Sequence, residues 1–361
     1  MRLRRTLPIL LAVVTIAAAL VLAVQLRKHA PPEPARLLPS ADGFFYGDYS
    51  WVRKANAGKP FAPVAHDPEY EKFIHETGFD FERDLESVAF AVHYPNHWPG
   101  GGTGDSSSEP RFSEVFTGHF DADKCTAYFK KIAKSVENYN SVDIFTIPIY
   151  DRTFRVTFLG VDTVAASNHD DPGVIRGMID RSRRLASPFG GPAFLRRYYK
   201  AVQLGSPVWL MLRVHPEAPG FEGWTTVFPK PADLVVSASY NPLHLPLRSG
   251  VLHLRAEAFA LDDDDAQNIA EKMNAFLSMF HSAEASVGST GADADFRAFF
   301  DSLQVRQHDN RAVLFAAVPT EIIRKLADSP SQIPALAIPP APEPSKEEPK
   351  KQVTPKKRKA R

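Results

Sequence analysis

The chain has 361 residues, of which 44% are hydrophobic and 11% aromatic, so it holds enough apolar material for a packed core and is not a disordered protein. The formal net charge of +1 is unevenly spread: residues 1–28 carry five basic residues and no acidic ones, residues 343–361 have a net charge of +5, and the stretch between them therefore has −9. An acidic body between two basic ends excludes nucleic-acid binding through the folded surface.

An uncharged apolar run predicts a transmembrane anchor near the start of the chain. Leu7 to Leu26 reads LPILLAVVTIAAALVLAVQL. Twenty helical residues at about 1.5 Å each span roughly 30 Å, which is enough to cross the core of a bilayer. The run is longer than the apolar core of a typical secretory signal peptide. We therefore expect an uncleaved anchor, with a cleaved signal peptide and a buried core helix as the alternatives.

Flanking charge and chain length predict how this anchor is oriented. Three arginines precede the apolar run and two basic residues follow it, which favours a cytoplasmic amino terminus only slightly. The first flank is short, and a long following domain can be translocated regardless of its charge. We expect a single-pass protein of the bacterial cytoplasmic (inner) membrane. Residues 1–28 are the cytoplasmic N-terminus and anchor, 29–42 are a proline-rich spacer, and the main domain is extracytoplasmic, in the periplasm or outside the cell.

The first half of the body carries both helix and strand signals. A helix over 68–77 should end at Gly78, and Asp121 or Asp123 should cap a helix over 124–136. Residues rich in Gly, Ser and Pro predict a mobile, exposed loop over 95–110. Strands are expected at 43–49, 88–94, 112–121, 143–150, 153–159 and 162–167, and Pro172 should open a helix over 173–185.

The second half has the same kinds of elements in a similar order. From about Asp263 to Glu284 the apolar residues recur at spacings of three and four, which predicts a long amphipathic helix. Strands are expected at 231–240, 251–261, 303–309 and 311–319, and further helices at 294–303 and 320–328.

Matching phrases in the two halves predict an internal duplication. LESVAFAVHY corresponds to DLVVSASY, EVFTGHFDAD to LRAEAFALDD, and TFRVTFLG to RAVLFAAVP. The order of strand pair, helix, strand pair and helix predicts an α+β fold of pseudo-duplicated antiparallel sheets with helices packed on one face. Because the linking stretch 194–214 is apolar enough to lie in a core, we expect one composite domain over 43–328, with halves of about 43–190 and 191–328.

Several phrases resemble uncharacterised bacterial proteins of the kind found in acidobacterial genomes, which have one N-terminal anchor. The phrases are LLPSADGFFYGDYSWVRKA, TGFDFERDLESVAFAV, RRYYKAVQLGSPVWL and LHLRAEAFALDD, within residues 37–328. The resemblance implies a bacterial envelope setting. It implies no activity, ligand or catalytic residue.

No complete catalytic or metal-binding motif occurs in the sequence. There is no G-x-S-x-G elbow, and no serine has a lysine three residues later. His75 begins a stretch like H-E-x-x-H, but Phe79 stands at the place of the second ligand, and a proline between His93 and His97 removes their helical spacing. The single cysteine, Cys125, permits no intramolecular disulfide and is expected to be a small core residue. We therefore assign no catalytic, cofactor-binding or metal-ligating residue.

The most chemically suggestive cluster is formed by His169, Asp170 and Asp171. These residues follow a predicted strand and precede the helix that Pro172 opens, where a metal ion or a substrate would be held. The alternative is structural, because Asp170 or Asp171 would cap that helix. The four aspartates at 262–265 likewise begin a helix and lack the ligand spacing of a calcium loop.

The last residues, 329–361, predict a disordered Pro-rich tail with a basic end. In an envelope setting the basic end favours anionic partners such as phospholipid headgroups, cell-wall polymers or the acidic body of the protein itself. The alternative is a solubilising tail without a partner, and no nucleic acid is expected. The basic end consists of Lys356, Lys357, Arg358, Lys359 and Arg361.

These features favour a membrane-anchored, extracytoplasmic and non-enzymatic protein that binds a partner or supports assembly in the envelope. One alternative is an enzyme whose site is assembled from sequence-distant residues around His169, Asp170 and Asp171. Another is a module that captures a ligand at the pseudo-twofold axis. Several histidines and acids in one pocket would favour catalysis, whereas a cleft between the halves would favour binding.

Overall fold

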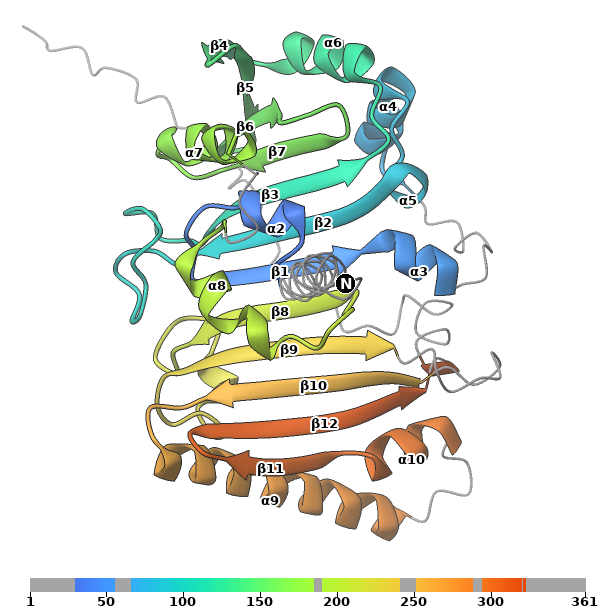
Figure 1. Ribbon diagram of the computed structural model, residues 1–361, viewed down its shortest axis with the longest axis vertical. Helices are drawn as coiled ribbons and strands as arrows, with labels where there is room; N and C mark the ends of the chain where they lie inside the picture. Colours follow the sequence, from blue (N-terminus) through green and yellow to red (C-terminus); the bar gives the residue numbers. More distant parts are fainter. Residues whose placement is uncertain are drawn as a thin grey trace, which may run out of the picture.

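A single antiparallel sheet of twelve strands forms the centre of the computed structural model (Figure 1). The structure describes residues 30–55, 66–184, 190–240, 251–287, 294–319 and 321–322. The strands follow the order β11-β12-β10-β9-β8-β1-β2-β3-β7-β6-β5-β4. Their bounds are β1 Gly43–Asp48, β2 Leu85–His93, β3 Arg111–Gly118, β4 Ser135–Tyr139, β5 Val142–Ile149, β6 Arg152–Phe158, β7 Thr163–Ser167, β8 Val208–Val214, β9 Ala232–Tyr240, β10 Val251–Phe259, β11 Gln304–His308 and β12 Arg311–Pro319. The α+β class predicted from the sequence is confirmed.

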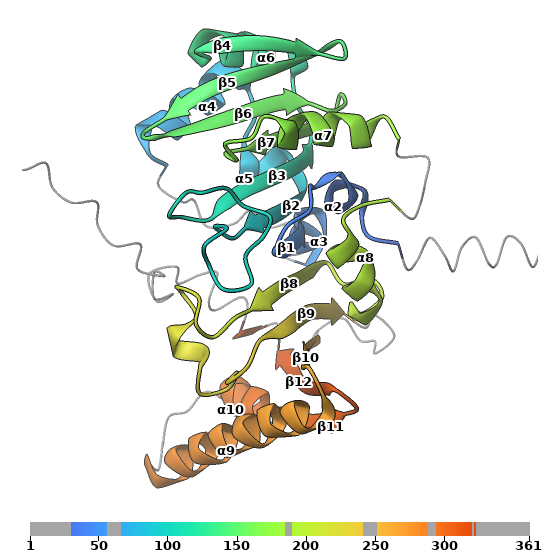
Figure 2. The ribbon, with the colours of Figure 1, turned by 90° about the vertical axis from the view of Figure 1, so that its left-hand side faces the viewer.

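Helices cover both faces of this sheet. The helices are α2 Glu33–Leu37, α3 Tyr49–Ala55, α4 Pro68–Thr77, α5 Phe81–Asp84, α6 Ala122–Ile132, α7 Gly173–Ser182, α8 Ala193–Tyr198, α9 Asp263–Val287 and α10 Ala294–Asp301. Figure 2 shows α2, α7 and α8 on one side, which we call the front face because it faces the viewer in Figure 1, and α4 and α6 on the other side, the back face. The prediction of helices on one face is wrong because the sheet carries apolar side chains on both faces.

The main core lies between the front-face helices and the central strands. Phe44 on β1 and Trp209 on β8 are buried there with Leu195 from α8 and Ile179 from α7. Tyr46 stacks on Trp209 with ring centroids 5.6 Å apart. This packing fixes α8 against the strands that border the candidate site described below.

One cross-strand row on the back face is apolar with a single exception. From β4 to β11 the register aligns Val136, Phe145, Val156, Ala166, Glu114, Phe90, Phe45, Leu210, Val236, Ala256, Leu314 and Val305. Helix α6 packs over one end of the row, and α9 packs over the other end. Glu114 is therefore the one charged residue in a twelve-residue row.

Capping residues explain where two of the helices begin and end. Asp67 accepts a hydrogen bond from the backbone N–H of Tyr70 at the start of α4, and Gly78 ends that helix in the left-handed conformation with φ of 73°. Asp121 accepts from the backbone N–H of Lys124 at the start of α6. The predicted stop at Gly78 and the predicted cap at Asp121 are confirmed.

The helix predicted over 124–136 ends earlier than expected. Helix α6 stops at Ile132, and β4 follows and pairs with β5. Ala133 already has an extended backbone, and Val136 lies opposite Phe145 in the sheet. The β-branched Val136 fits a pleated strand beside an aromatic partner, and this pairing outweighs the local helix signal.

The segment predicted as a proline-rich spacer, 29–42, is part of the folded body from residue 33 onward. It contains α2, and Ala35, Leu37 and Leu38 are buried in the main core. A proline within the first helical turn costs no hydrogen bond, so the prolines here begin a helix instead of extending a linker.

The sequence left the linking stretch 194–214 without assigned elements, and this stretch supplies α8 and the central strand β8. The predicted anchor, Leu7 to Leu26, and the predicted tail, 329–361, lie outside the described residues, as does most of the helix predicted over 320–328. Among the described residues no helix has the length and apolar character that crossing a bilayer requires.

Candidate functional site

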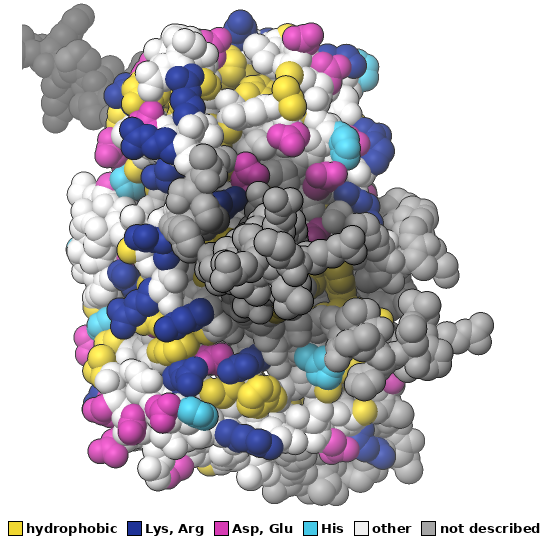
Figure 3. Space-filling model, in the orientation of Figure 1, with side chains coloured by type: hydrophobic (Ala, Val, Ile, Leu, Met, Phe, Trp, Pro, Cys, Tyr) yellow, Lys and Arg dark blue, Asp and Glu magenta, His cyan; other side chains and the backbone are white. Residues whose placement is uncertain are grey.

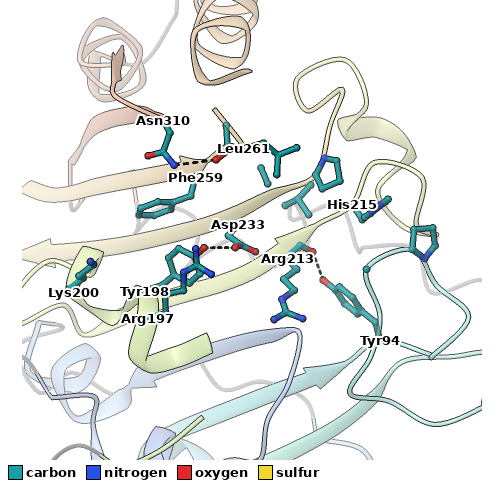
Figure 4. Close-up of a pocket in the computed structure, with 16 residues that line it drawn as sticks. Tyr94, Arg197, Tyr198, Lys200, Arg213, His215, Asp233, Phe259, Leu261 and Asn310 are labelled. Carbon is teal, nitrogen blue, oxygen red and sulfur yellow. Dashed lines mark hydrogen bonds between the residues drawn. The ribbon is translucent and has the colours of Figure 1, made fainter. Parts of the chain in front are cut away.

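An open cleft of about 520 Å³ lies at the ends of three interior strands, where β8 and β10 end and β9 begins (Figure 4). Helix α8 and the 3-10 turn η1, Tyr199–Ala201, form one wall. Tyr94 and Pro99, which follow β2, contribute from the first half of the chain, and the second half contributes most of the lining. The cleft therefore belongs mainly to the second half of the chain, to which the first half adds Tyr94, Pro99 and Gly100.

Two exposed cations line the wall of the cleft. Arg197 lies on α8 and Lys200 on η1, three positions further along the chain. No carboxylate in the described ranges forms an ion pair with either side chain. The Arg197 guanidinium lies 5.1 Å from the centroid of the Tyr198 ring, which orients it without neutralising it. Figure 3 shows that Lys and Arg side chains gather on the left part of the front face.

The carboxylate of Asp233 also lines the cleft, and it is engaged by a neighbour. The buried Tyr198 hydroxyl donates a hydrogen bond to Asp233 Oδ2 over 2.5 Å. Burial and the adjacent carboxylate raise the pKa of Tyr198, so this phenol remains a proton donor. The hydrogen bond directs one carboxylate oxygen of Asp233 toward Tyr198 (Figure 4).

The floor of the cleft is built around Arg213 at the end of β8. Its guanidinium forms an ion pair with Asp42, Nη1 to Oδ1 3.1 Å, and lies 4.9 Å from the centroid of the Phe194 ring. The Tyr94 hydroxyl donates to the Arg213 carbonyl over 3.0 Å. The charge of Arg213 is thus balanced by Asp42, so in the described ranges Arg197 and Lys200 are the Lys and Arg side chains of the lining without an ion pair, and together they outnumber the one lining carboxylate, Asp233.

The remaining walls are apolar or weakly polar. Phe259 and Leu261 come from the end of β10, and the Asn310 side chain donates to the Ala260 carbonyl over 3.3 Å. His215 lies opposite α8, and its Nδ1 is buried without a hydrogen-bond partner in the described part of the chain. The cleft can thus hold an anionic group on the α8 wall and an apolar or aromatic group beside Phe259.

The comparisons with known proteins concern only the fold. No protein-family model matches the chain, and no curated protein sequence does. Three solved structures of TP0453 are similar in fold. Crystal form III gives a TM-score of 0.40 at 11% identity and covers 83% of this chain and 99% of that chain. Crystal forms IV and I give TM-scores of 0.38 and 0.39 at 11% and 9% identity, and each covers 83% of this chain and 98% of that chain.

The structure places His169, Asp170 and Asp171 outside the cleft, in the turn between β7 and α7. His169 is buried, and its ring nitrogens lie 3.2 Å from the Thr103 carbonyl and 3.1 Å from the backbone N–H of Asp171. Asp171 accepts from the backbone N–H of Gly173 over 2.7 Å, at the start of α7. Asp171 thus binds a backbone N–H at the start of α7, although the N-cap position itself is Pro172, which makes no side-chain cap hydrogen bond.

The third member of this cluster, Asp170, helps to tie the long loop to the sheet. It forms an ion pair with Arg111 at 3.1 Å, and its backbone N–H donates to Asp105 over 3.2 Å. Asp105 also faces Arg111, and hydrogen bonds from Ser107 and Asp170 outweigh burial and lower the pKa of Asp105 well below its usual value. All these side chains are engaged in holding the loop.

A buried polar row lies beneath this turn. His93 Nε2 lies 3.0 Å from the Ser113 hydroxyl, which lies 3.0 Å from the Ser167 hydroxyl. Burial, followed by the neighbouring His169, lowers the pKa of His93 to about 4, so the ring is neutral near pH 7. The side chains of His93, Ser113, Ser167 and His169 are all buried. The row therefore lacks the access to solvent that a nucleophile needs.

The other residues considered from the sequence lie apart from one another. His93 is buried and His97 is exposed, so they do not face a common site. Cys125 is buried, and burial raises the pKa of its thiol to about 11, as expected for a core residue. In the ranges that the structure describes, no group of three or more His, Cys, Asp or Glu side chains is placed to hold a metal ion.

The sequence analysis did not identify the residues of the cleft. The only local signal is the phrase RRYYK at 196–200, in which two arginines, two tyrosines and a lysine follow one another across α8 and η1. The other contributors, Tyr94, Arg213 and Asp233, are far apart in the chain and meet only because β8 lies between β1 and β9.

Proposed function

We propose that this protein is a non-enzymatic binding module whose cleft takes a ligand with a phosphate or carboxylate group. The observation that carries this proposal is the pair Arg197 and Lys200, two exposed cations on one wall of a cleft whose single lining carboxylate, Asp233, is engaged by Tyr198. A guanidinium and an ammonium group on one wall suit the oxygens of an anionic group. Phe259 and Tyr198 supply apolar surface for the remainder of such a ligand.

We place this module on the extracytoplasmic side of a bacterial inner membrane, held by the anchor Leu7 to Leu26. The length and apolar character of that segment support the placement. The basic end of the tail, Lys356 to Arg361, is suited to anionic lipid or cell-wall polymer. A reporter fused at residue 340 should be active outside the cytoplasm, and activity only inside it would refute the placement. Binding to anionic vesicles at low salt should weaken in a chain that ends at Pro330, and equal binding would remove the role of the tail.

We also infer that the body arose by duplication. In the first half the strands lie in the order β1-β2-β3 followed by β7-β6-β5-β4, and in the second half in the order β8-β9-β10 followed by β12-β11. Each half thus has three successive neighbouring strands, a helix after the third, and a last strand, β7 or β12, that returns to pair with the third. By this topology the counterpart of β12 is β7 and not β6, in which the phrase TFRVTFLG begins. The strands β1 and β8 then pair across the junction, as a local twofold axis requires.

The binding proposal is tested by isothermal titration calorimetry. The full-length protein in lipid nanodiscs is titrated with inorganic phosphate, pyrophosphate and citrate in turn. The double substitution Arg197→Ala with Lys200→Ala should weaken binding at least tenfold, because both cations that face the anion are removed. Arg196→Ala is the matched control, since Arg196 is exposed on the same helix but does not line the cleft. Equal loss in the control, or no saturable binding of any of the three anions to the unaltered protein, would refute the proposal.

A further inference from the structure

A second cavity, of about 390 Å³, lies between α9 and the back face of the sheet. Strands β9, β10 and β12 form its floor, and α9 forms its roof through Met273, Phe276 and Leu277. The segment after the 3-10 turn η2, Glu222–Trp224, closes one side. Every residue that lines this cavity is hydrophobic, so it offers no side-chain hydrogen bond to a ligand except from the indole of Trp224.

Small side chains in the floor create the space. Ala258 on β10 lies opposite Ala312 on β12, and Ala256 lies one step further along the same face of β10. Leu254 and Leu314 are larger and border the floor. Protein interiors are normally packed without voids of this size, and ligand sites begin at about 300 Å³. The cavity is therefore large enough to be a binding site.

The mouth of the cavity exposes large apolar side chains. Trp224 and Phe276 both line it, and they are 45% and 56% exposed. Met279, which follows Phe276 by three positions on α9, is 65% exposed. Single exposed apolar residues are ordinary, but two large ones at the rim of an apolar cavity, with Met279 exposed nearby on the same helix, favour a site for an apolar partner.

The apolar surface continues beyond the cavity along the cross-strand row. Val236 in the cavity floor lies opposite Leu210, which lies opposite Phe45, and Phe45 lies opposite Phe90. A second apolar hollow of about 400 Å³ opens over these last three residues. The two hollows therefore follow one cross-strand row, which runs across several strands from α9 to Glu114, a residue that lines the second hollow.

We propose that the cavity under α9 binds a single acyl chain, supplied either by a free fatty acid or by a membrane lipid. A peptide or a sugar would place polar groups against this lining and leave them without hydrogen bonds, whereas a hydrocarbon chain has none to lose. A flexible chain also fits an elongated track better than a compact ring system does. This proposal depends neither on the anionic cleft nor on the placement of the anchor.

The test is photolabelling of unfractionated lysates of cells that make the full-length chain, so that its outcome does not depend on where the chain is located. One arm uses a C16 fatty acid with a mid-chain diazirine, and the other uses phosphatidylcholine with the same labelled chain. A third sample receives a diazirine sterol. Peptide mapping should find chain adducts on Met273 and Phe276. Label from the free acid alone identifies a fatty acid as the source, and label from the phospholipid identifies a lipid.

Ala256→Phe fills the cavity and should lower labelling of α9 at least tenfold, as judged by mass spectrometry. Ala127→Leu is the matched control, since Ala127 is exposed on α6, far from the cavity in the sheet order. If Ala256→Phe does not fold, Phe276→Ser removes a half-exposed wall residue instead. Adducts that are unchanged in these variants, or that spread without enrichment at α9, would overturn the proposal. Labelling of α9 by the sterol but not by either chain would overturn it as well.

Discussion

Asp42 and Arg213 form an ion pair at the centre of the sheet, with Nη1 3.1 Å from Oδ1, although 171 positions separate them in the chain. The Asp42 carboxylate is fully buried. Its other oxygen accepts hydrogen bonds from the backbone N–H of Tyr94, over 2.9 Å, and from the Thr103 hydroxyl. One side chain thus joins the start of β1, the end of β8 and the loop after β2, and it holds the floor of the cleft.

The substitution Asp42→Ala should lower the free energy of unfolding by about 3 kcal/mol, because it leaves three hydrogen-bond donors without their buried acceptor. Urea unfolding followed by circular dichroism at pH 7 measures this loss. Asp151→Ala is the control, since Asp151 is exposed in the turn before β6, and it should stay within about 0.5 kcal/mol of the unaltered protein. A loss below about 1 kcal/mol for Asp42→Ala would show that the ion pair contributes little.

Glu114 should make the protein less stable as the pH rises. Burial raises the pKa of its carboxyl to about 7, and its row neighbours are Ala166 and Phe90. The unfolded chain releases this proton near pH 4.5 and the folded chain near pH 7, so the contribution of Glu114 to stability falls between these values and is constant above them. Glu114→Gln should remove this fall and stabilise the protein at pH 8 by roughly 2 to 3 kcal/mol.

Urea unfolding at several pH values checks this prediction, with the difference between Glu114→Gln and the unaltered protein as the readout. Glu86→Gln serves as the control, because Glu86 is exposed on the neighbouring strand β2. A difference that does not change between pH 4.5 and pH 8 would show that Glu114 ionises in the folded protein as it does in water.

Local signals in the sequence were sufficient to predict those helices and strands that end in a capping residue or a tight turn. Gly78 and Asp121 mark the ends of helices by their backbone and hydrogen-bonding chemistry, and the three strands β5, β6 and β7 are separated by short turns. The central strand β8 was not assigned, because its sequence VWLMLRV is apolar on both faces and so lacks the alternation of apolar and polar residues that identifies a strand. Prolines also misled the interpretation of residues 33–42, since they begin a helix there.

The cleft was beyond prediction for a different reason. Asp42, Tyr94 and Arg213 are brought together by the strand order, which the sequence does not contain as a local pattern. His169 and Asp171 were visible because they are adjacent in the chain, yet their contacts are those of a helix start. Polar residues that are adjacent in the chain most often form hydrogen bonds with the nearby backbone. Binding sites, in contrast, are commonly formed by residues that are distant in the chain.

His93 should remain neutral well below the pH at which a solvated histidine protonates. Burial and the nearby His169, whose ring centroid is 5.2 Å away, lower the pKa of His93 to about 4. The unfolded chain takes up this proton near pH 6.5, so the contribution of His93 to stability is complete above pH 6.5 and is lost as the pH falls toward 4. NMR titration of the ring carbon should give a midpoint near 4, and a midpoint above 6 would contradict the burial of this side chain.

The loop over 95–110 was expected to be exposed and mobile, but two of its glycines lie close to backbone atoms. Gly101 lies against Pro95, and Gly104 lies against Tyr94. A Cβ atom on Gly104 would lie 2.2 Å from the Tyr94 carbonyl oxygen, whereas a Cβ atom on Gly102 would meet nothing within 4 Å. The Tyr94 backbone N–H is the group that binds Asp42, so a displacement there would also disturb the floor of the cleft.

Gly104→Ala should therefore lower the free energy of unfolding by about 2 kcal/mol, because the backbone must shift to accept the methyl group. Gly102→Ala adds the same methyl group in open space of the same loop and should change stability by no more than about 0.5 kcal/mol. Urea unfolding of the two variants side by side makes the comparison. Equal stabilities would mean that Gly104 does not contact Tyr94 in solution, and the loop would then be as mobile as its composition suggests.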